Sequence, residues 1–205
     1  MNSGNIYVIA APSGAGKTTL VLALLAAEPQ VQLSISYTSR APREGEVDGR
    51  DYHFVSRETF EAMIARGEFL ESAEVYGNYY GTSQVWINEA LAAGKDILLE
   101  IDTQGAAQVR RLFPQAISTF ILPPSAEILE QRLRNRGKDS EDAIERRLKA
   151  AREEIAHVEE FDHIIVNEHI DEAVRDIIAI VRAGRLTLNR QVARHSELIS
   201  KLKGA

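Results

Sequence analysis

A Gly-rich turn near the start of the chain most constrains the fold, because an apolar strand pattern precedes it and an apolar helix pattern follows it. Residues 5–10 predict a short buried strand, and the leucines that begin at Leu20 predict a helix. The turn between them reads Ala11-Pro12-Ser13-Gly14-Ala15-Gly16-Lys17-Thr18. It matches G-x-x-x-x-G-K-[ST] at every position except the first. The sequence therefore predicts a strand–loop–helix unit with a phosphate-binding loop.

The residue types in this loop suit a nucleoside triphosphate. Glycines let backbone N–H groups turn toward phosphate oxygens, and the amino end of the following helix favours negative charge. Lys17 supplies a mobile cation, and the Thr18 hydroxyl can ligate Mg²⁺, with Thr19 as a second candidate. A bare G-K-T could also be a turn with a solvated lysine, but the flanking strand and helix favour the phosphate loop. We expect Ala11 to reduce the flexibility of the loop.

Further strands and helices alternate along the chain, which predicts a parallel α/β sheet. We expect strands at residues 97–102, 117–122 and 163–166. The corresponding helices are predicted at residues 104–112, at 125–134, from residue 140 and from residue 171. Residues 36–90 interrupt this alternation with Arg, Gly, Tyr and Ser, short strand patterns and one helix near residues 58–66. The weak helical pattern of residues 186–205 could pack on the body or on another subunit.

Composition and charge exclude several classes of protein. The 205 residues fit one domain, and the absence of cysteine excludes disulfides and thiolate metal sites and is consistent with a reducing compartment. The first residues are too short and too polar for a signal peptide or a membrane span, so we expect a cytoplasmic location without membrane partners. A net charge of −6 argues against broad nucleic-acid binding. Any phosphate ligand must therefore meet local basic clusters, such as residues 40–50 and 132–147.

Two carboxylates follow the second predicted core strand. Glu100 and Asp102 are two residues apart, so alternation along a strand places both on one face at the carboxyl edge of the sheet. Ligands of α/β sheets bind at that edge. These carboxylates can hold Mg²⁺ or orient an acceptor, and the alternative is an ordinary acid that caps the next helix.

The interrupting segment carries groups suited to a phosphate monoester. Arg40 and Arg43 lie in a predicted loop, and arginine forks bind phosphate dianions well. Tyrosines and hydroxyl residues follow, together with Glu71. Each of these features alone could be a solvated turn with tyrosines packed at its base. Residue chemistry therefore leaves the base of the acceptor open.

Four parts of this segment, taken with the phosphate loop, resemble the bacterial form of guanylate kinase over nearly the whole chain. They are residues 36–46, Tyr52, Glu71 and residues 77–82. The resemblance implies the P-loop nucleoside-monophosphate kinase fold, with a parallel sheet flanked by helices, a mixed GMP-binding insert and a helical lid. The implied divisions are a core of residues 1–35, 91–131 and 157–205, an insert of residues 36–90 and a lid of residues 132–156.

The resemblance also implies the reaction. ATP phosphorylates GMP, with dGMP as a further acceptor, by direct in-line transfer with Mg²⁺, in purine nucleotide metabolism and GMP recycling. Because an open site would expose ATP to water, we expect the insert and the lid to close on the core. The carboxylate of Glu71 can accept both guanine donors, N1–H and N2–H, and a well-formed site of this kind rejects adenine by roughly 10⁴-fold.

Residue roles carry over by position. The implied ATP-binding residues are Ala11, Pro12, Ser13, Gly14, Ala15, Gly16, Lys17, Thr18, Thr19 and, near adenine, Asn167, with Thr18 as the metal ligand. The implied GMP-binding residues are Arg40, Arg43, Tyr52 and Tyr80 at the phosphate, Ser36, Glu71, Thr82 and Asp102 around guanine, and Glu100. The implied catalytic residues are Lys17, Asp102 and the lid arginines Arg132, Arg136 and Arg147. Some relatives carry serine at the Thr82 position and aspartate at the Glu100 position, and both changes keep the functional group.

Three alternatives remain. The lid arginines could form a solvated basic helix that pairs with nearby acids. The chain could be a non-catalytic guanylate-kinase-like interaction domain, for which a degraded phosphate loop would be typical, whereas Gly16-Lys17-Thr18 is intact. It could also be a related kinase for another phosphate ester, against which Glu71 and residues 80–82 argue.

Overall fold

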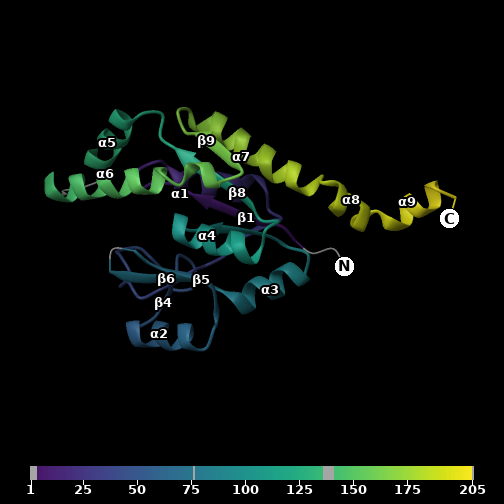
Figure 1. The fold of residues 1–205 in the computed structure, drawn as a ribbon, viewed down its shortest axis with the longest axis horizontal. Helices are drawn as coiled ribbons and strands as arrows, with labels where there is room; N and C mark the ends of the chain where they lie inside the picture. The colour runs from purple at the N-terminus through teal and green to yellow at the C-terminus, as the bar shows by residue number, and fades with distance from the viewer. Residues whose placement is uncertain (1–3, 76, 136–140, 205) are drawn as a thin grey trace.

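The computed structural model describes residues 4–75, 77–135 and 141–204. A parallel sheet with the order β2-β7-β1-β8-β9 runs through its centre (Figure 1). Its strands are β1 (Ile6–Ala10), β2 (Val31–Leu33), β7 (Asp96–Glu100), β8 (Ile117–Leu122) and β9 (His163–Val166). The central strand β1 pairs Ile9 with Glu100 on one side and Ala10 with Phe120 on the other. The carboxyl ends of these strands therefore share one edge of the sheet.

Helices bury both faces of the central strands, which explains why β1 and the middle of β7 are continuously apolar. Ile6 and Val8 point to the face covered by α3 (Gln84–Ala92) and α4 (Thr103–Leu112). Tyr7 and Ile9 point to the opposite face, which α1 (Lys17–Ala27) and α7 (Ile170–Arg185) cover. The strand alternation thus divides the apolar core into two layers around the sheet.

A second, mixed sheet with the order β4-β3-β6-β5 lies to one side of the central sheet (Figure 1). Its strands are β3 (Tyr37–Thr38), β4 (His53–Phe54), β5 (Phe69–Val75) and β6 (Asn78–Ser83). The helix α2 (Arg57–Ala65) packs on this sheet through Phe60, whose ring stacks on Phe69 at 4.4 Å and on Tyr79 at 5.3 Å between centroids. This unit therefore has its own aromatic core.

Two helices lie on the opposite side of the central sheet. They are α5 (Ala126–Asn135) and α6 (Glu141–Ile155), and they pack through Leu129, Leu133 and Ala151. The Ser125 hydroxyl accepts a hydrogen bond from the N–H of Ile128 at 3.2 Å and so caps α5, as its sequence position predicts. A short 3₁₀ turn, η1 (Val158–Glu160), then leads into β9.

The chain ends in a helical arm. Figure 1 shows α8 (Leu188–Arg194) and α9 (Ser196–Leu202) continuing from α7 away from the central sheet. Within the residues described, no helix combines the length and apolar character that crossing a membrane would need. We call α8 and α9 the C-terminal arm.

Most of the predicted elements are confirmed. The strands at residues 117–122 and 163–166 have the expected bounds, and helices occupy the expected stretches before and after them. The sequence analysis missed β2, which has three residues, and α3, whose polar and apolar residues follow directly on β6. The position at which a helix was expected to open, residue 140, lies outside the described residues.

Candidate active site

The phosphate-loop segment forms a tight turn at the carboxyl edge of the central sheet. Gly14 and Gly16 both have a φ of 93°, in the left-handed region that favours glycine, and the N–H of Ala15 donates to the Pro12 carbonyl at 3.1 Å. The helix α1 begins at Lys17. The turn therefore ends at a helix amino terminus, which is the arrangement that binds anions.

Asn167, the residue after β9, binds this turn through its side chain. Its side-chain amide donates to the Ala15 carbonyl at 2.7 Å, and a Cβ added to Gly16 would lie 2.4 Å from the same amide nitrogen. Arg132 reaches the turn from α5, donating to the carbonyls of Ala15 at 3.4 Å and Asn167 at 3.2 Å. A cavity of about 520 Å³ opens here, lined by Gly14, Gly16, Thr19, Arg132, Asn135, Asn167, Glu168 and Ile170.

Ala11 occupies the position that the motif gives to glycine. Its side chain is half-buried and packs against the core layer that contains Ile9 and Leu20. The methyl group therefore contributes to the packing of the loop on α1.

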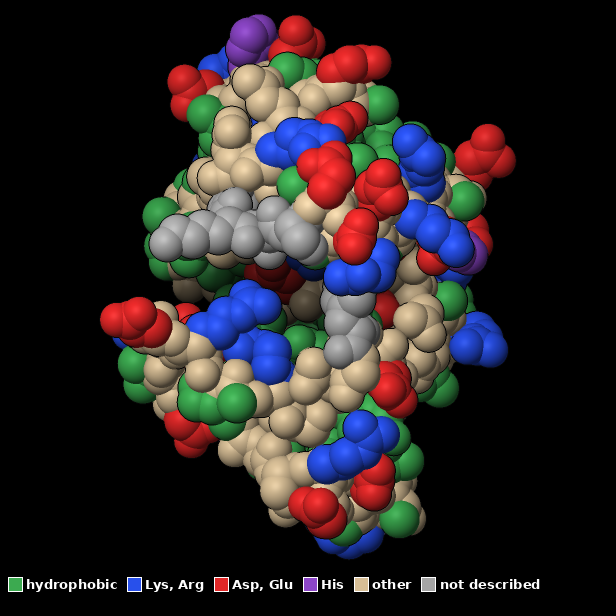
Figure 2. All heavy atoms as spheres, turned by 90° about the vertical axis from the view of Figure 1, so that its left-hand side faces the viewer, with side chains coloured by type: hydrophobic (Ala, Val, Ile, Leu, Met, Phe, Trp, Pro, Cys, Tyr) green, Lys and Arg blue, Asp and Glu red, His purple; other side chains and the backbone are tan. Residues whose placement is uncertain are grey.

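A second cavity, of about 280 Å³, lies between the mixed sheet and the carboxyl edge of the central sheet. In Figure 2 a hollow separates the two halves of the molecule, and Lys and Arg side chains gather at its rim. Its lining includes nine residues singled out in the sequence: Lys17, Ser36, Arg40, Arg43, Tyr52, Glu71, Tyr80, Glu100 and Asp102. It also includes Glu46, Ala73, Val75 and Ile101. We call this space the acceptor cavity.

Glu71 is a buried carboxyl in the wall of the acceptor cavity. The Thr82 hydroxyl, which is fully buried on the neighbouring strand, donates to its Oε1 atom at 2.6 Å. Burial raises the pKa of Glu71 to about 7, the hydrogen bond from Thr82 opposes this shift, and the nearby Asp102 adds to it. Glu71 therefore changes charge near neutral pH in the absence of a ligand.

Replacing Glu71 by the uncharged glutamine should stabilise the unliganded protein at pH 8. The folded state of the wild type holds this proton up to about pH 7, whereas the unfolded state releases it near pH 4.5, so the free energy of unfolding falls as pH rises between these values. The shift corresponds to roughly 3 kcal/mol. In urea unfolding, Glu71→Gln should exceed the wild type by about this amount at pH 8 and by about zero at pH 4.5. An equal difference at both pH values would contradict the argument.

The two strand-end carboxylates have different roles in the structure. Glu100 remains in β7 and lies 3.8 Å from the Lys17 ammonium, so it faces the phosphate loop. Asp102 caps α4 by accepting the N–H of Gly105 at 2.8 Å, which is the structural alternative to a ligand role. Both carboxylates nevertheless line the acceptor cavity.

Arg40, also in the lining of the acceptor cavity, is held by Glu46, a residue that the sequence analysis did not single out. Arg40 donates to both carboxylate oxygens of Glu46, at 2.9 and 3.0 Å, and the N–H of Arg43 donates to the same carboxylate at 2.7 Å. These hydrogen bonds, that of Arg40 foremost, lower the pKa of Glu46. Tyr52 and Tyr80 meet edge to face at 5.9 Å beside the guanidinium. The R-x-x-E spacing of Arg43 and Glu46 was visible in the sequence, but such a spacing alone does not predict which residues the carboxylate contacts.

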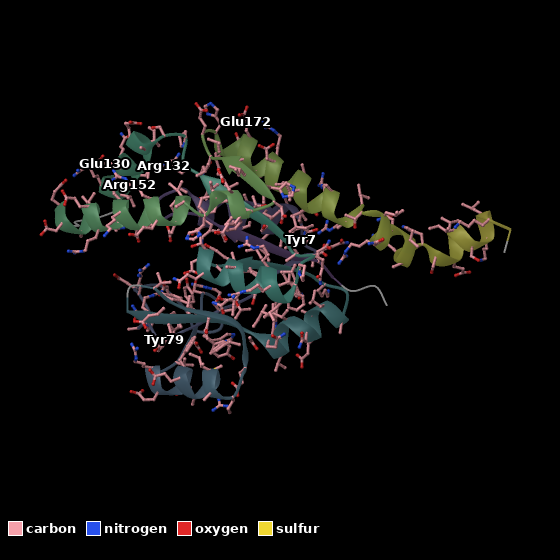
Figure 3. The ribbon with its side chains drawn as sticks, viewed as in Figure 1. Tyr7, Tyr79, Glu130, Arg132, Arg152 and Glu172 are labelled. Atoms are coloured by element: carbon pink, nitrogen blue, oxygen red, sulfur yellow. The ribbon has the colours of Figure 1, made fainter. Side chains whose placement is uncertain are left out.

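The arginines of α5 and α6 divide into two groups. Arg132 and Arg147 point to the phosphate loop, and Arg147 donates to the Ser13 hydroxyl at 2.9 Å. Arg134 instead pairs with Glu130 and Glu141, as expected of a solvated basic helix. Figure 3 shows Arg132 and Glu130 on the side of the central sheet opposite Tyr79 of the mixed sheet. The predicted catalytic residue Arg136 lies outside the described residues.

Glu154 of α6 was also missed by the sequence analysis. It is half-buried close to Lys17, whose charge partly offsets a rise in the pKa of Glu154 that burial causes. Arg147 and Glu154 are seven residues apart, about two helical turns, so they share one face of α6, which they turn toward the loop. Only the folded structure reveals that this face meets the phosphate loop.

The guanylate kinase family model matches residues 3–184. The chain belongs to the guanylate kinase family. Its relatives of that name include one from Dechloromonas aromatica, 60% identical over 200 residues that cover 98% of this chain and 99% of the relative. Another, from Nitrosospira multiformis, is 57% identical over 199 residues, covering 97% and 95%. The crystal structure of guanylate kinase from Anaplasma phagocytophilum has a TM-score of 0.79 and 37% identity, covering 98% of this chain and 96% of that one.

The two cavities are consistent with membership in the guanylate kinase family. Guanylate kinases are transferases that phosphorylate GMP with ATP, and such an enzyme needs neighbouring sites for a triphosphate and a monophosphate. Here the phosphate loop borders both spaces, since Gly16 lines the larger cavity and Lys17 lines the acceptor cavity. The fold class expected from the sequence is confirmed.

Proposed function

We propose that this chain transfers the γ-phosphoryl group of ATP to GMP, with ATP at the phosphate loop and GMP in the acceptor cavity. The main observation for this assignment is that one cavity is lined by the carboxyl of the buried Glu71–Thr82 pair and by Arg40 and Arg43. A carboxylate and arginines in one cavity match a guanine base and its 5′-phosphate. The lined volume of about 280 Å³ suits a nucleotide once the walls move apart slightly.

Guanine recognition is assigned to Glu71. The ionised carboxylate would accept N1–H and N2–H of guanine, while Thr82 keeps one of its oxygens oriented. Adenine presents an acceptor at N1 and would leave a buried carboxylate without its second partner, which is costly. Ser36 and Asp102 complete the proposed base site from the same cavity lining.

Phosphate recognition is assigned to Arg40 and Arg43, assisted by Tyr52 and Tyr80. In the structure the Nη2 atom of Arg40 donates to both oxygens of the Glu46 carboxylate, and its Nη1 atom donates to the Ala41 carbonyl. The GMP phosphate would share or replace this anionic partner, and the pre-formed pair keeps the guanidinium oriented before GMP arrives.

Transfer is assigned to charge stabilisation by Lys17, Arg132 and Arg147, with Arg136 as a further lid residue. Thr18 stands exposed in the first turn of α1, and Glu100 lies beside Lys17, so a hydroxyl and a carboxylate suited to Mg²⁺ are available near the phosphate loop. When bound, the ion would neutralise charge on the β- and γ-phosphates. Lys17 would orient these phosphates, and the arginines would exclude water as the lid closes.

The domain divisions remain part of this proposal. The mixed sheet with α2 has its own aromatic core, and α5 with α6 has a separate small apolar cluster. We assign the insert to residues 36–90 and the lid to residues 132–156, and both would close toward the core on binding nucleotides. Small-angle scattering should show a decrease in the radius of gyration when GMP and a non-hydrolysable ATP analogue are added together.

The Thr82 hydroxyl provides a direct test of the base site. In Thr82→Val the shape is kept but the donor to Glu71 is lost, so GMP affinity should fall about tenfold. Thr82→Ser keeps the hydroxyl and should stay within about threefold of the wild type. GMP titration by calorimetry without ATP measures both. Equal affinities of the valine and serine variants would contradict the assignment of Glu71 to guanine.

The C-terminal arm is proposed to contact a second copy of the chain. Leu188, Leu198 and Leu202 are more than half exposed along α8 and α9. Leucines on an arm that leaves the body are typical of an interface between subunits. Light scattering tests this proposal, which predicts a mass of at least a dimer and fails for a monomer at micromolar concentration.

A further inference from the structure

A third cavity, of about 380 Å³, lies at the edge of the central sheet opposite the active site. It is bordered by the starts of β2 and β7, by the turn after α3 and by α8. Parallel strands carry their amino ends at one edge and their carboxyl ends at the other, so this space is separate from both nucleotide cavities. Its lining residues Arg190, Gln191 and Arg194 follow residue 184, where the match to the family model ends.

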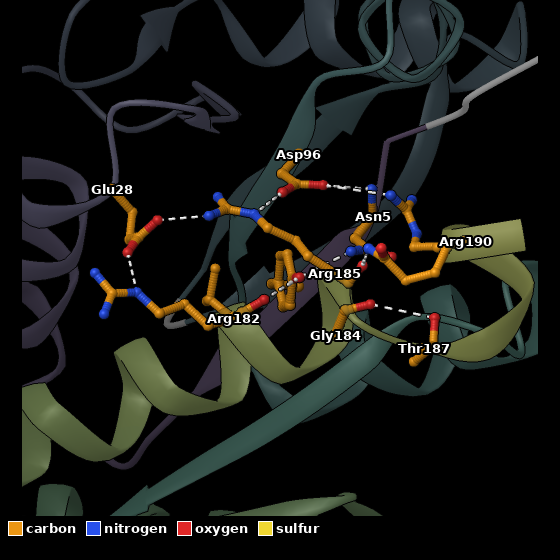
Figure 4. A network of polar contacts seen from close by, with 11 residues as sticks. Asn5, Glu28, Asp96, Arg182, Gly184, Arg185, Thr187 and Arg190 are labelled. Carbon is orange, nitrogen blue, oxygen red and sulfur yellow. Dashed lines mark hydrogen bonds and ion pairs between the residues drawn. The ribbon is translucent and has the colours of Figure 1, made fainter. Parts of the chain in front are cut away.

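The lining of this cavity is strongly cationic although the chain as a whole is acidic. It contains four basic side chains and one carboxylate: Lys95, Arg185, Arg190, Arg194 and Asp96. Asp96 is already shared, since it accepts from Arg185 at 2.6 Å and from the N–H of Asn5 at 2.8 Å and lies 3.9 Å from Arg190 (Figure 4). The cavity therefore has a positive excess that its own acid does not balance.

Arg185 also has a hydrogen-bond donor without an acceptor among the described residues. Its Nε atom binds Asp96 and its Nη1 atom binds Glu28 at 2.5 Å, while its Nη2 atom is buried without a hydrogen-bond partner. Figure 4 shows the guanidinium held between these two carboxylates. A buried donor without an acceptor is unfavourable, and a small shift of this guanidinium toward the adjoining cavity would let a bound anion accept from it.

The base of the C-terminal arm is oriented toward this space. The Gln191 side chain donates to the Arg185 carbonyl at 2.8 Å, which ties α8 to the end of α7. Arg190 and Arg194 are four residues apart and so lie on one face of α8, which lines the cavity. Among the residues that the structure describes, Lys95 and Arg194 form no ion pair within 4 Å, so both cations are available to a ligand.

We propose that this cavity binds a small phosphate-bearing anion between the core and the arm, held by Lys95, Arg185 and Arg194. Several converging donors suit the three oxygens of a phosphate group better than a single carboxylate. The volume is in the range of small-ligand sites. Binding would join α8 to the turn after α3 and so fix the direction in which the arm leaves the body. This inference does not depend on the identity of the kinase substrate.

Calorimetric titration with inorganic phosphate tests the site while GMP and a non-hydrolysable ATP analogue, with Mg²⁺, fill the catalytic cavities. The wild type should show one saturable event, and Lys95→Gln and Arg194→Gln should each weaken it about three- to tenfold. Lys201→Gln removes an equal charge from exposed α9 and should leave the affinity unchanged. Succinate at the same ionic strength should bind at least tenfold more weakly than phosphate.

Two further measurements control for unfolding of the variants and identify the class of ligand. The unliganded melting temperatures of Lys95→Gln and Arg194→Gln should match that of the wild type, so a loss of phosphate binding would not reflect unfolding. A titration with CMP distinguishes the source of the ligand, because tighter binding than phosphate assigns the site to nucleotides and equal binding assigns it to the phosphate group alone. Absence of saturable phosphate binding, wild-type phosphate affinity in the two cavity variants, or tighter binding of succinate than of phosphate would overturn the proposal.

Discussion

Lys17→Ala is expected to lower the turnover number by about 10³-fold, the scale on which loss of a positioned charge at a transferring phosphoryl group acts. Lys17 lies at the first position of α1, between the phosphate loop and Glu100. Its removal leaves the backbone turn intact but takes away the mobile cation that would orient the triphosphate. Coupled measurement of ADP formation with ATP, Mg²⁺ and GMP gives the turnover number.

Lys149→Ala is the matched control for Lys17→Ala. This lysine lies on α6 with a side chain that is 80% exposed, and it forms a 4.0 Å pair with Glu153. Its removal should change turnover by less than twofold. The melting temperatures of both variants should stay close to the wild-type value. If Lys17→Ala retained more than a tenth of the turnover, the phosphate loop would not be the site of transfer.

Glu71→Gln is expected to lower kcat/KM for GMP by about 10³-fold, because the amide can accept only one of the two guanine donors and turns its own N–H₂ toward the other. The same substitution should raise stability at pH 8, so lost activity cannot be attributed to unfolding. Steady-state kinetics at pH 8, where the wild-type carboxyl is ionised, measure the effect.

The control for Glu71→Gln comes from the same strand. Glu74 of β5 is exposed and lies 3.9 Å from Arg57, outside the acceptor cavity. Glu74→Gln should leave kcat/KM for GMP within about twofold of the wild type. Equal losses for the two variants would mean that the charge of the insert, and not the carboxylate at position 71, supports activity.

The sequence predicted the central sheet well because strands buried on both faces are continuous apolar runs. Ile6–Ala10 and Ile117–Leu122 are examples, and proline and glycine separate such runs along the chain. β2 escaped detection because three residues carry too little pattern, and its place is set by pairing with β7. Tertiary contact, and not local preference, therefore fixes that edge of the sheet.

The candidate site, like the fold, could be predicted from the sequence only in part. Local pattern alone pointed to residues 11–18, since strand, glycines, lysine and threonine are contiguous. The acceptor cavity is lined by residues that are far apart in the chain, such as Arg40, Glu71 and Glu100. No local sequence pattern could predict that these residues lie together. Family resemblance brought them together. Glu46 and the cluster of cations near Asp96 became visible only through contacts, because a sequence does not show which charged side chains the fold brings together.

The most direct test of the central claim compares acceptors in the wild-type enzyme. ADP formation is measured with ATP and Mg²⁺ and either GMP or AMP as the acceptor, each over a range of concentrations at pH 8. The Glu71 site predicts that kcat/KM for GMP exceeds that for AMP by roughly 10⁴-fold. Equal values for GMP and AMP would contradict the assignment of the acceptor cavity to guanine.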